Sequence, residues 1–267
     1  MPAMEYDEYD IDWLMEASEE GIVQAKLILA EHYLAGDGVP EDESMALRLF
    51  TQAYEAGHLG AMVKIAELYL DDGPVPIDYS QAFRCFLKAA QEGDLEGHYR
   101  VGCMYLDGLG VPQQYDRAFE HFTRAASEGY PRACWKLGLL YREGLTGKKN
   151  PAKAIELLEE ARQNQVWEAG IALGEMFLNG EGVPRDSARA SRYFEESAEK
   201  GNVDAQYLIG RMYCLGIELG KDLKRAVGWL EKAVEKDHPK AMSLLGSMYL
   251  LGKGVEKDYP IAAKIFM

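Results

Sequence analysis

Ser197 and Lys200 form the closest match to a catalytic motif in this sequence. Ser197-Ala-Glu-Lys200 fits S-x-x-K, the nucleophile signature of penicillin-recognising enzymes. The S-D-N and K-T-G motifs that accompany this signature are absent from the sequence. Ser197 also stands where equivalent segments of the chain place a buried alanine, so its hydroxyl is expected to face a neighbouring helix. A hydrolase is therefore kept as a minor alternative.

The sequence contains no recognisable pattern for a metal, a phosphate or a cofactor. It has no H-E-x-x-H, C-x-x-C or Walker-type loop, and Gly147-Lys148-Lys149 lacks the upstream glycine that such a loop requires. The five histidines are scattered, without a pair at the i, i+4 spacing of metal ligands on one helix. We therefore predict no catalytic residues, no metal and no cofactor, and expect that the protein is not an enzyme. His58 and His238 share one turn position, where a solvated side chain is expected.

The chain is organised by an internal repeat of 36 residues. With a small residue as the first position, units begin at residues 25, 61, 97, 133, 169, 205 and 241. Five positions later stands alanine or glycine, and three further on an aromatic ring, as at Ala30 and Tyr33. A fixed period of this size indicates a solenoid, in which each unit packs only on its neighbours. Such arrays usually display a surface rather than enclose a reaction.

Each unit predicts two helices and no strand. The first helix, as in residues 97–108, is amphipathic and ends at a glycine. In the second helix, Ala118, Phe122 and Ala125 fall at i, i+4 and i+7, which makes a buried stripe. A glycine closes most second helices, but the fourth unit has Gln165 there. Polar residues suited to capping begin them: Asp42, Asp78, Asn150, Asp186, Asp222 and Asp258.

These units resemble Sel1-like repeats, which are relatives of the tetratricopeptide repeat. The resemblance rests on the small–x–x–aromatic pattern of the first helix, a G-x-G-V-P loop and the A-x-x-x-F-x-x-A pattern of the second helix. The loop is complete at Gly36–Pro40, Gly108–Pro112 and Gly180–Pro184, whereas the fourth and sixth units depart from it. The resemblance implies an all-α, right-handed α/α superhelical solenoid of about seven repeats that acts as a scaffold or adaptor for other proteins.

The two ends differ from the interior units. Residues 1–24 are expected to form an acidic leader and one helix that matches the second half of a unit, with Trp13, Leu14 and Ala17 in its apolar positions. Residues 25–267 form the repeat array, whose last unit is incomplete. The apolar residues near that end are expected either to be covered by a longer natural chain or to support self-association. They are Ile261, Ile265 and Phe266.

Net charge narrows the range of partners. A net charge of −15 and a pI near 4.8 oppose binding to nucleic acid, which requires a basic patch. The same charge favours a basic protein or peptide as partner, or serves solubility alone. It is uneven, because residues 1–43 carry thirteen acidic side chains and one basic side chain, Lys26.

The sequence also bears on the compartment. No apolar stretch of about 18 residues predicts a membrane span. The acidic N-terminus lacks the basic and apolar regions of a signal peptide, which favours the cytoplasm, while the periplasm or the exterior stays open if a targeting segment has been removed. The resemblance implies one regular cysteine pair per repeat in some secreted members. The four cysteines here occupy four different repeat positions, so reduced and mostly buried thiols are expected.

The resemblance also implies where a partner would bind. In related helix-pair repeats the first helices line the concave side, so residues two, six, nine and ten positions after each unit start are expected there. Predicted aromatic anchors in these rows are Tyr99, Trp135 and Tyr207. The predicted acidic rim consists of Glu31, Glu67, Asp71, Asp107, Glu143 and Glu175. Arg142 and Arg211 are expected either to pair with these carboxylates or to clamp a carboxylate of the partner. Alternatively, the rings pack between first helices and the carboxylates are merely solvated.

Two classes of function follow. The first is an adaptor that captures a basic, partly extended segment or an exposed helix, with carboxylates that steer association in a salt-dependent way. The second is a stoichiometric inhibitor of a basic toxin or effector enzyme, which the resemblance supplies because some immunity proteins contain such repeats. A toxin gene beside this one would favour the second class.

Overall fold

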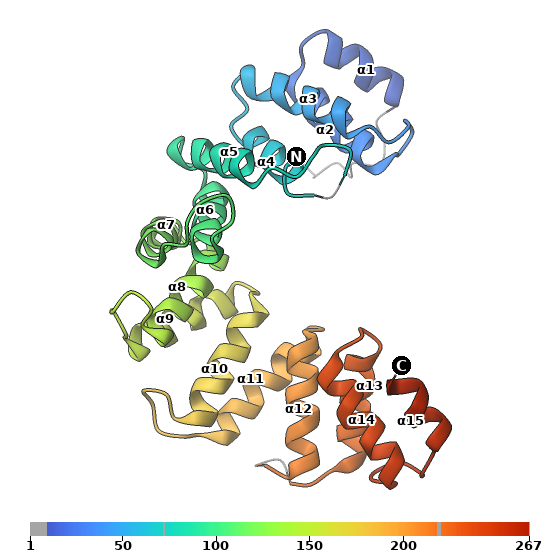
Figure 1. Ribbon diagram of the computed structural model, residues 1–267. Coiled ribbons are helices and arrows are strands. Elements are labelled where there is room, and N and C mark those ends of the chain that lie inside the picture. Colours follow the sequence, from blue (N-terminus) through green and yellow to red (C-terminus); the bar gives the residue numbers. More distant parts are fainter. Residues whose placement is uncertain (1–9, 72, 218–219, 267) are drawn as a thin grey trace, which may run out of the picture. The chain divides into compact units, whose positions relative to one another are not determined.

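The structure is a computed structural model that describes residues 10–71, 73–217 and 220–266 (Figure 1). These residues form fifteen α-helices and no strand, which confirms the predicted all-helical fold. The leader predicted before the first helix lies outside the described residues as far as residue 9. The helices are α1 (Ile11–Glu19), α2 (Val23–Ala35), α3 (Glu43–Glu55), α4 (Ala61–Leu68), α5 (Tyr79–Gln91), α6 (Leu95–Asp107), α7 (Tyr115–Ser127), α8 (Pro131–Glu143), α9 (Pro151–Gln163), α10 (Trp167–Asn179), α11 (Ser187–Glu199), α12 (Val203–Leu215), α13 (Leu223–Val234), α14 (Pro239–Leu251) and α15 (Tyr259–Phe266).

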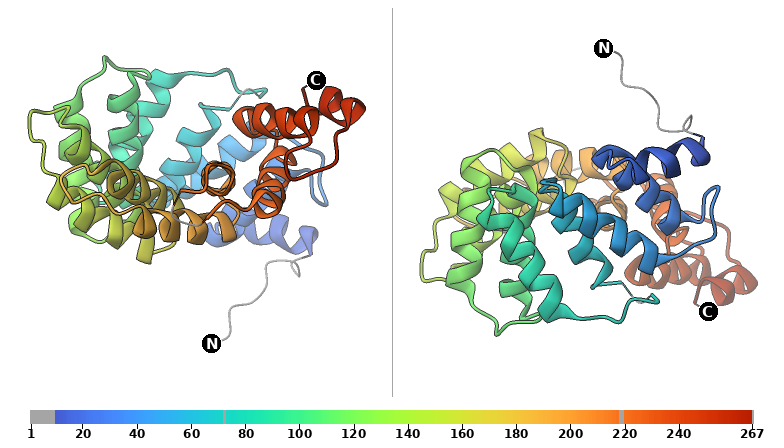
Figure 2. Two further views of the ribbon diagram at one scale, coloured as in Figure 1. Left: turned by 90° about the horizontal axis from the view of Figure 1, so that it is seen from below. Right: turned by 90° about the horizontal axis from the view of Figure 1, so that it is seen from above.

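The chain divides into two compact units, Met1–Tyr130 and Pro131–Met267. The first unit holds α1 to α7 and the second holds α8 to α15. Within each unit a helix packs on the helices before and after it in the chain, and Figure 2 shows these pairs from two further sides. Packing between neighbours along the chain is what a solenoid of repeats requires.

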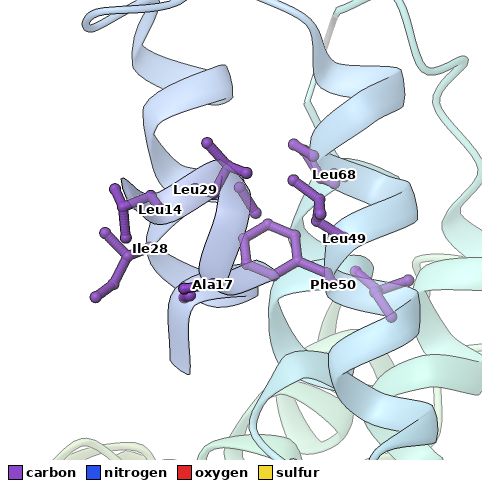
Figure 3. Close-up of a cluster of buried hydrophobic side chains, with 11 residues drawn as sticks. Leu14, Ala17, Ile28, Leu29, Leu49, Phe50 and Leu68 are labelled. Carbon is purple, nitrogen blue, oxygen red and sulfur yellow. The ribbon is translucent and has the colours of Figure 1, made fainter. Parts of the chain in front are cut away.

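The first six repeats each bury one large side chain of the second helix, whereas the equivalent Phe266 in the last repeat is 49% exposed. In the first unit Phe50 of α3 is fully buried in a cluster with Leu14 of α1, Ile28 and Leu29 of α2, and Leu68 of α4 (Figure 3). Helix α1 therefore supplies the missing half of the first core, as its match to a second helix predicted. Burial of such side chains contributes roughly 1.5–3 kcal/mol each.

Small residues on the first helix make room for this side chain. A Cβ added to Gly102 would lie 2.6 Å from the ring of Phe122, and one added to Gly210 would lie 3.0 Å from Leu230. Because such contacts are too close for a methyl group at the present spacing, glycine sets the distance between the two helices of these repeats.

The predicted helix ends are confirmed. Asp42 Oδ1 accepts a hydrogen bond from the amide of Met45 at 2.9 Å, and all the other predicted caps cap their helices in the same way. Most first helices end at left-handed glycines such as Gly108, with a φ of 72°, whereas α4 ends at Tyr69 with a φ of −77°. After α9 the left-handed residue is Gln165, with a φ of 67°, at the position where the other repeats favour glycine.

Two predictions about burial are wrong. Trp13 is 47% exposed, because it lies about 100° around the helix from the buried Leu14. His238 is not a solvated turn residue, since its side chain is 9% exposed. Its Nδ1 accepts a hydrogen bond from the amide of Ala241 at 3.0 Å and so caps α14.

Within the described ranges all four cysteines are thiols, with Cys134 buried and the other three half-buried. Burial raises the pKa of Cys134 to about 11 and also raises the pKa of Cys85 and Cys214. Thiols with raised pKa values are poor nucleophiles at neutral pH. Among the described residues every helix is too short or too polar to cross a bilayer.

Candidate binding surface

The predicted surface occupies one side of the first helices, at positions two, six, nine and ten of each repeat. Position ten is exposed in every repeat, from Ala35 to Leu251. The exposure of position two differs between repeats, since Val63 is buried whereas Ser243 is exposed. The rows are therefore accessible mainly near the C-terminal ends of the first helices.

In the first unit an ion-pair ladder crosses α2, α4 and α6. Lys64 Nζ lies 3.5 Å from Glu31 and 4.0 Å from Glu67. Arg100 donates to Glu67 at 2.9 Å and to Glu96 at 2.7 Å. Two carboxylates of the predicted acidic rim, Glu31 and Glu67, therefore have basic neighbours. The surface alternates in charge along this ladder.

A cleft of about 370 Å³ opens beside the ladder, between α2 and α4. Leu27 and Ile28 line it together with the charged Glu31 and Lys64. Apolar walls with a few charged groups at the edge are usual in sites that hold one side chain of a partner. Leu27 belongs to the predicted row at position two, so the cleft lies within the predicted surface.

Tyr99 belongs to the core of the first unit. It is 8% exposed, and its ring centroid lies 6.0 Å from that of Phe122 and 5.6 Å from that of Tyr130. Aromatic pairs at these distances contribute about 0.5–1.5 kcal/mol beyond their buried area. Little of this ring is left to contact a partner, which favours the packing alternative at Tyr99.

The other two predicted anchors, Trp135 and Tyr207, are half-buried in the second unit. Lys136 Nζ lies 4.4 Å from the centroid of the Trp135 ring, a cation–π distance. Tyr207 stacks on His238 with centroids 4.9 Å apart, and His238 Nε2 lies 3.1 Å from Asp204 Oδ1. Neighbours thus restrain both rings, which lowers the entropy that each would lose on contact with a partner.

Arg142 lies in a network with two carboxylates of the second unit. Its Nε and Nη2 donate to Glu181 at 2.6 and 2.9 Å, and its Nη1 donates to Glu175 at 2.8 Å. The hydrogen bonds from Arg142 lower the pKa of Glu181 to about 2, and the bond to Glu181 raises the pKa of Arg142 above its usual value. Arg142 was predicted either to pair with carboxylates of this chain or to clamp a carboxylate of a partner, and its hydrogen bonds favour the first role.

The remaining predicted residues are exposed. They are Asp71, Asp107, Glu143 and Arg211. Asp107 and Glu143 are the last residues of α6 and α8, where a negative charge is unfavourable next to the negative end of the helix dipole. Stability therefore does not account for these two acids. Among the described residues no carboxylate lies within ion-pairing distance of Arg211.

Sequence reasoning missed three features of this surface. Lys64, Arg100 and Lys136 are basic residues three positions after the starts of the second, third and fourth units, a pattern that the period makes visible. His98 and His121 lie with their Nδ1 atoms 3.1 Å apart, although 23 residues separate them. The third feature is that the net charge differs between the two compact units. Residues 1–130 contain 25 acidic and 8 basic side chains, a net charge of −17, whereas residues 131–267 contain 19 and 21, a net charge of +2.

Ser197 has a structural role. It is 1% exposed, and its Oγ donates to the carbonyl of Trp167 at 3.0 Å. The Nζ of Lys200 lies 5.6 Å from the centroid of the Trp167 ring. A buried hydroxyl that donates to a neighbouring helix agrees with the predicted packing position and gives a substrate no access to it.

The sequence pattern of the Sel1 repeat matches this chain seven times, at residues 23–58, 60–94, 95–130, 131–165, 167–202, 203–238 and 239–266. A protective antigen present in uropathogenic Escherichia coli strains, which displays an SLR fold, is 30% identical with a TM-score of 0.78, over 96% of this chain and 55% of the antigen. This chain thus spans about half of that protein. A Sel1 repeat protein from Oxalobacter formigenes is 27% identical with a TM-score of 0.76, over 97% and 77% of the two chains. An immunity protein from Pseudomonas aeruginosa, at 19% identity, a TM-score of 0.53 and 90% of each chain, shares the fold alone. No curated protein is similar in sequence.

Proposed function

The chain belongs to the Sel1 repeat family, and on this premise we propose that it is a scaffold whose protein partner docks on the first-helix surface. The observation that carries the proposal is that core positions repeat while exposed positions vary. Position five is alanine or glycine in all seven repeats, whereas position ten, which is exposed in every repeat, changes from Ala35 to Glu143 to Leu251. The fold requires the first set, so the second set is available for recognition of a partner.

The division of charge supports a basic partner for the first unit. A net charge of −17 in residues 1–130 creates a negative field that raises the association rate of a positively charged partner. Asp71 and Asp107 occupy equivalent exposed positions on this unit, and Asp107 lies at a helix end where it opposes the dipole. Asp107 is exposed and lowers the stability of its helix, so contact with a partner is the simplest explanation for an acid at this position.

The rings of the second unit supply apolar contact area. Trp135 and Tyr207 are half-buried and restrained by Lys136 and His238. Tryptophan and tyrosine of this kind are common among residues that dominate binding energy. In this proposal the acids of the first unit steer association and the rings of the second unit slow dissociation.

Affinity capture with charge-reversed variants tests the proposal. The immobilised protein is incubated with extract of its source cells at low salt and at about 0.5 M salt, and bound proteins are identified. We expect a dominant basic partner that salt releases and that Asp71→Lys with Asp107→Lys fails to retain. The matched control reverses the same charge on the exposed side of α7, with Asp116→Lys and Glu120→Lys. If both variants and the original protein capture the same proteins, the first-helix surface is not the binding site.

Inhibition of a basic toxin or effector enzyme is a narrower form of the same proposal. The negative charge of residues 1–130 favours it, because such a surface complements a basic active site. If the captured partner is an enzyme, one equivalent of this protein should abolish its turnover. Undiminished turnover in the complex would leave the scaffold function and exclude inhibition.

A further inference from the structure

The second unit carries an exposed surface that differs from the rest of the repeat rows. Leu215 and Leu251 occupy position ten, the last residue of α12 and α14, and both are 61% exposed. The equivalent residues of the preceding four repeats are polar: Asp71, Asp107, Glu143 and Asn179. The exposure of Leu215 does not depend on its place in the array, because a further repeat follows it and it is as exposed as Leu251.

A cleft of about 810 Å³ lies at the same ends of the helices. Ile217, two residues after Leu215, and the largely buried Phe177 in the last turn of α10 line its apolar part. Arg185, Asp186 and Arg189 line its polar part. Arg185 is exposed, whereas Arg189 lies with its guanidinium carbon 4.2 Å from the centroid of Phe177. Arg189 also lies 3.6 Å from Glu159, so Arg185 is the basic side chain of the cleft that is open to a ligand, beside the apolar Ile217.

Lysines extend the positive charge toward the two leucines. A Cβ added to Gly216, the residue after Leu215, would lie 3.2 Å from the Cβ of Lys221. Lys253 comes two residues after Leu251, and its amide donates to the carbonyl of Met248 in α14 at 3.0 Å. We define the loop-end patch as Arg185, Arg189, Leu215, Ile217, Leu251 and Lys253. In a protein with a net charge of −15, this basic and apolar surface is complementary to an acidic segment that carries apolar or aromatic side chains.

The same chain contains such a segment. Glu5 to Asp10 reads E-Y-D-E-Y-D, a tandem tripeptide in which each copy brings two carboxylates and one tyrosine. Carboxylates pair with arginine through two parallel hydrogen bonds, and tyrosine buries a large ring while its hydroxyl stays hydrated. Six residues span at most roughly 20 Å when a peptide is extended, which is enough for one peptide to contact several side chains of the patch.

We propose that the segment Glu5–Asp10 of a second copy of this chain docks on the loop-end patch. The tyrosines contact Ile217 and Leu215, and the carboxylates pair with Arg185 and the lysines. The contact joins two different surfaces. If two copies each dock their segment on the other's patch, they form a closed dimer, and if each copy docks on a further copy, they form an open chain of copies. The patch shares repeat position ten with the first-helix surface but includes none of the first-unit acids and neither ring. Oligomeric state rather than capture of a partner tests it, so its failure is distinguishable from failure of the partner-binding function.

Sedimentation velocity of the full chain tests it, over protein concentrations from about 1 to about 100 µM, where a small contact of this kind is populated. We expect association that strengthens with concentration and weakens at about 0.5 M salt. Arg185→Glu with Leu215→Glu should weaken association at least tenfold, and Tyr6→Ser with Tyr9→Ser should do the same. Arg185 and Leu215 are exposed, and circular dichroism melts check that the fold is retained in each variant. Arg192→Glu, an exposed arginine of α11 outside the cleft, is the matched control and should associate like the original protein.

A charge exchange makes the test specific. Glu5→Lys with Glu8→Lys should restore association when it is mixed with the Arg185→Glu variant, since the ion pairs are then reversed. A protein that stays monomeric at all concentrations overturns the proposal. So does association that survives the Tyr6 and Tyr9 substitutions, because the segment would then not be the occupant.

Discussion

His98 and His121 hold their Nδ1 atoms 3.1 Å apart where α6 packs on α7. Burial and the neighbouring imidazole lower the pKa of His121 from 6.5 to about 4, and burial also lowers the pKa of His98. The surrounding charges do not remove this effect, since Arg117 and Arg124 act with it and carboxylates nearby act against it. The pair is therefore accommodated best when both rings are neutral.

This relationship predicts that the protein loses stability in mild acid. The folded pKa lies below the unfolded value, so the unfolded state binds more protons between about pH 6.5 and 4, and the free energy of unfolding falls as the pH falls through that window. The rings are partly exposed, so we expect a loss on the order of 1 kcal/mol. Urea denaturation at pH 7.5, 6.5 and 5.5 measures it for the original protein and for His121→Phe. Parallel curves for the two proteins would contradict the assignment.

Arg142 predicts a large effect of one charge in the second unit. Its side chain is 17% exposed and donates two hydrogen bonds to Glu181 and one to Glu175. We expect Arg142→Met to lower the free energy of unfolding by about 2 kcal/mol at pH 7, because two partly buried carboxylates lose their donor. Arg117, which is 58% exposed beside Glu120, is the matched control, and Arg117→Met should change stability by less than about 0.5 kcal/mol.

Arg142 and Glu181 set a pH dependence of the same sign in a lower pH window. The pKa of Glu181 is lowered to about 2, so its contribution is complete above the unfolded value of 4.5 and is lost as the pH falls toward 2. The difference in stability between Arg142→Met and the original protein should therefore shrink below pH 4.5. Chemical denaturation at pH 7, 5 and 3.5 checks this. A constant difference would mean that Arg142 acts through packing of its stem rather than through its charge.

Gln165 predicts a stabilising substitution. Its φ is 67°, a left-handed conformation that carries a penalty for every residue except glycine. We expect Gln165→Gly to raise the free energy of unfolding by about 0.5–1 kcal/mol. Gly129 closes the preceding repeat with a φ of 82° and nothing within 4 Å of an added Cβ, so Gly129→Ala should lower stability through the backbone alone. Thermal melts of the two variants should shift in opposite directions.

Much of the fold was predictable because one repeat encodes it locally. Capping by Asp186 and the left-handed turn at Gly180 depend on residues within a few positions of each other. Contacts between repeats are less local and still regular. Glu67 and Arg100 are 33 residues apart, and so are Arg142 and Glu175, because both pairs join neighbouring repeats one helical turn out of phase. A period of 36 therefore makes such ion pairs predictable in principle.

For the candidate site, the sequence predicts which repeat positions lie on the first-helix surface but not which side chains at these positions are exposed. The period places Tyr99, Trp135 and Tyr207 at one repeat position, but their exposure depends on the residues around them. Tyr99 is buried because Phe122 and Tyr130 pack on it, and those contacts arise from the size of side chains elsewhere in the repeat. Periodicity alone therefore does not separate a core ring from an exposed ring.

Two helical glycines predict substitutions of opposite sign. A Cβ on Gly174 would overlap the ring of Phe194, whereas a Cβ on Gly228 of α13 would meet nothing within 4 Å. Gly228→Ala should raise the free energy of unfolding by about 0.8–1 kcal/mol, the difference in helix propensity. Gly174→Ala gains the same propensity and must displace the ring at a penalty of about 1–3 kcal/mol, so we expect a net loss. Equal gains in denaturant midpoint would show that the helices separate freely at Gly174, the position that Ala30 occupies in the first repeat.

Trp135 and Tyr207 predict a separation between binding and stability. Both rings are half-buried, so Trp135→Ala with Tyr207→Ala should leave the fold intact and weaken partner binding at least tenfold, which corresponds to about 1.4 kcal/mol or more. Tyr99→Ala should behave differently. Its ring is 8% exposed between two aromatic neighbours, so the substitution should lower the free energy of unfolding by about 3 kcal/mol or more. Isothermal titration with the captured partner and urea denaturation measure the two effects. Unchanged affinity in the double variant would show that the rings serve packing, and the partner would then have to be held by the polar residues of the first-helix surface.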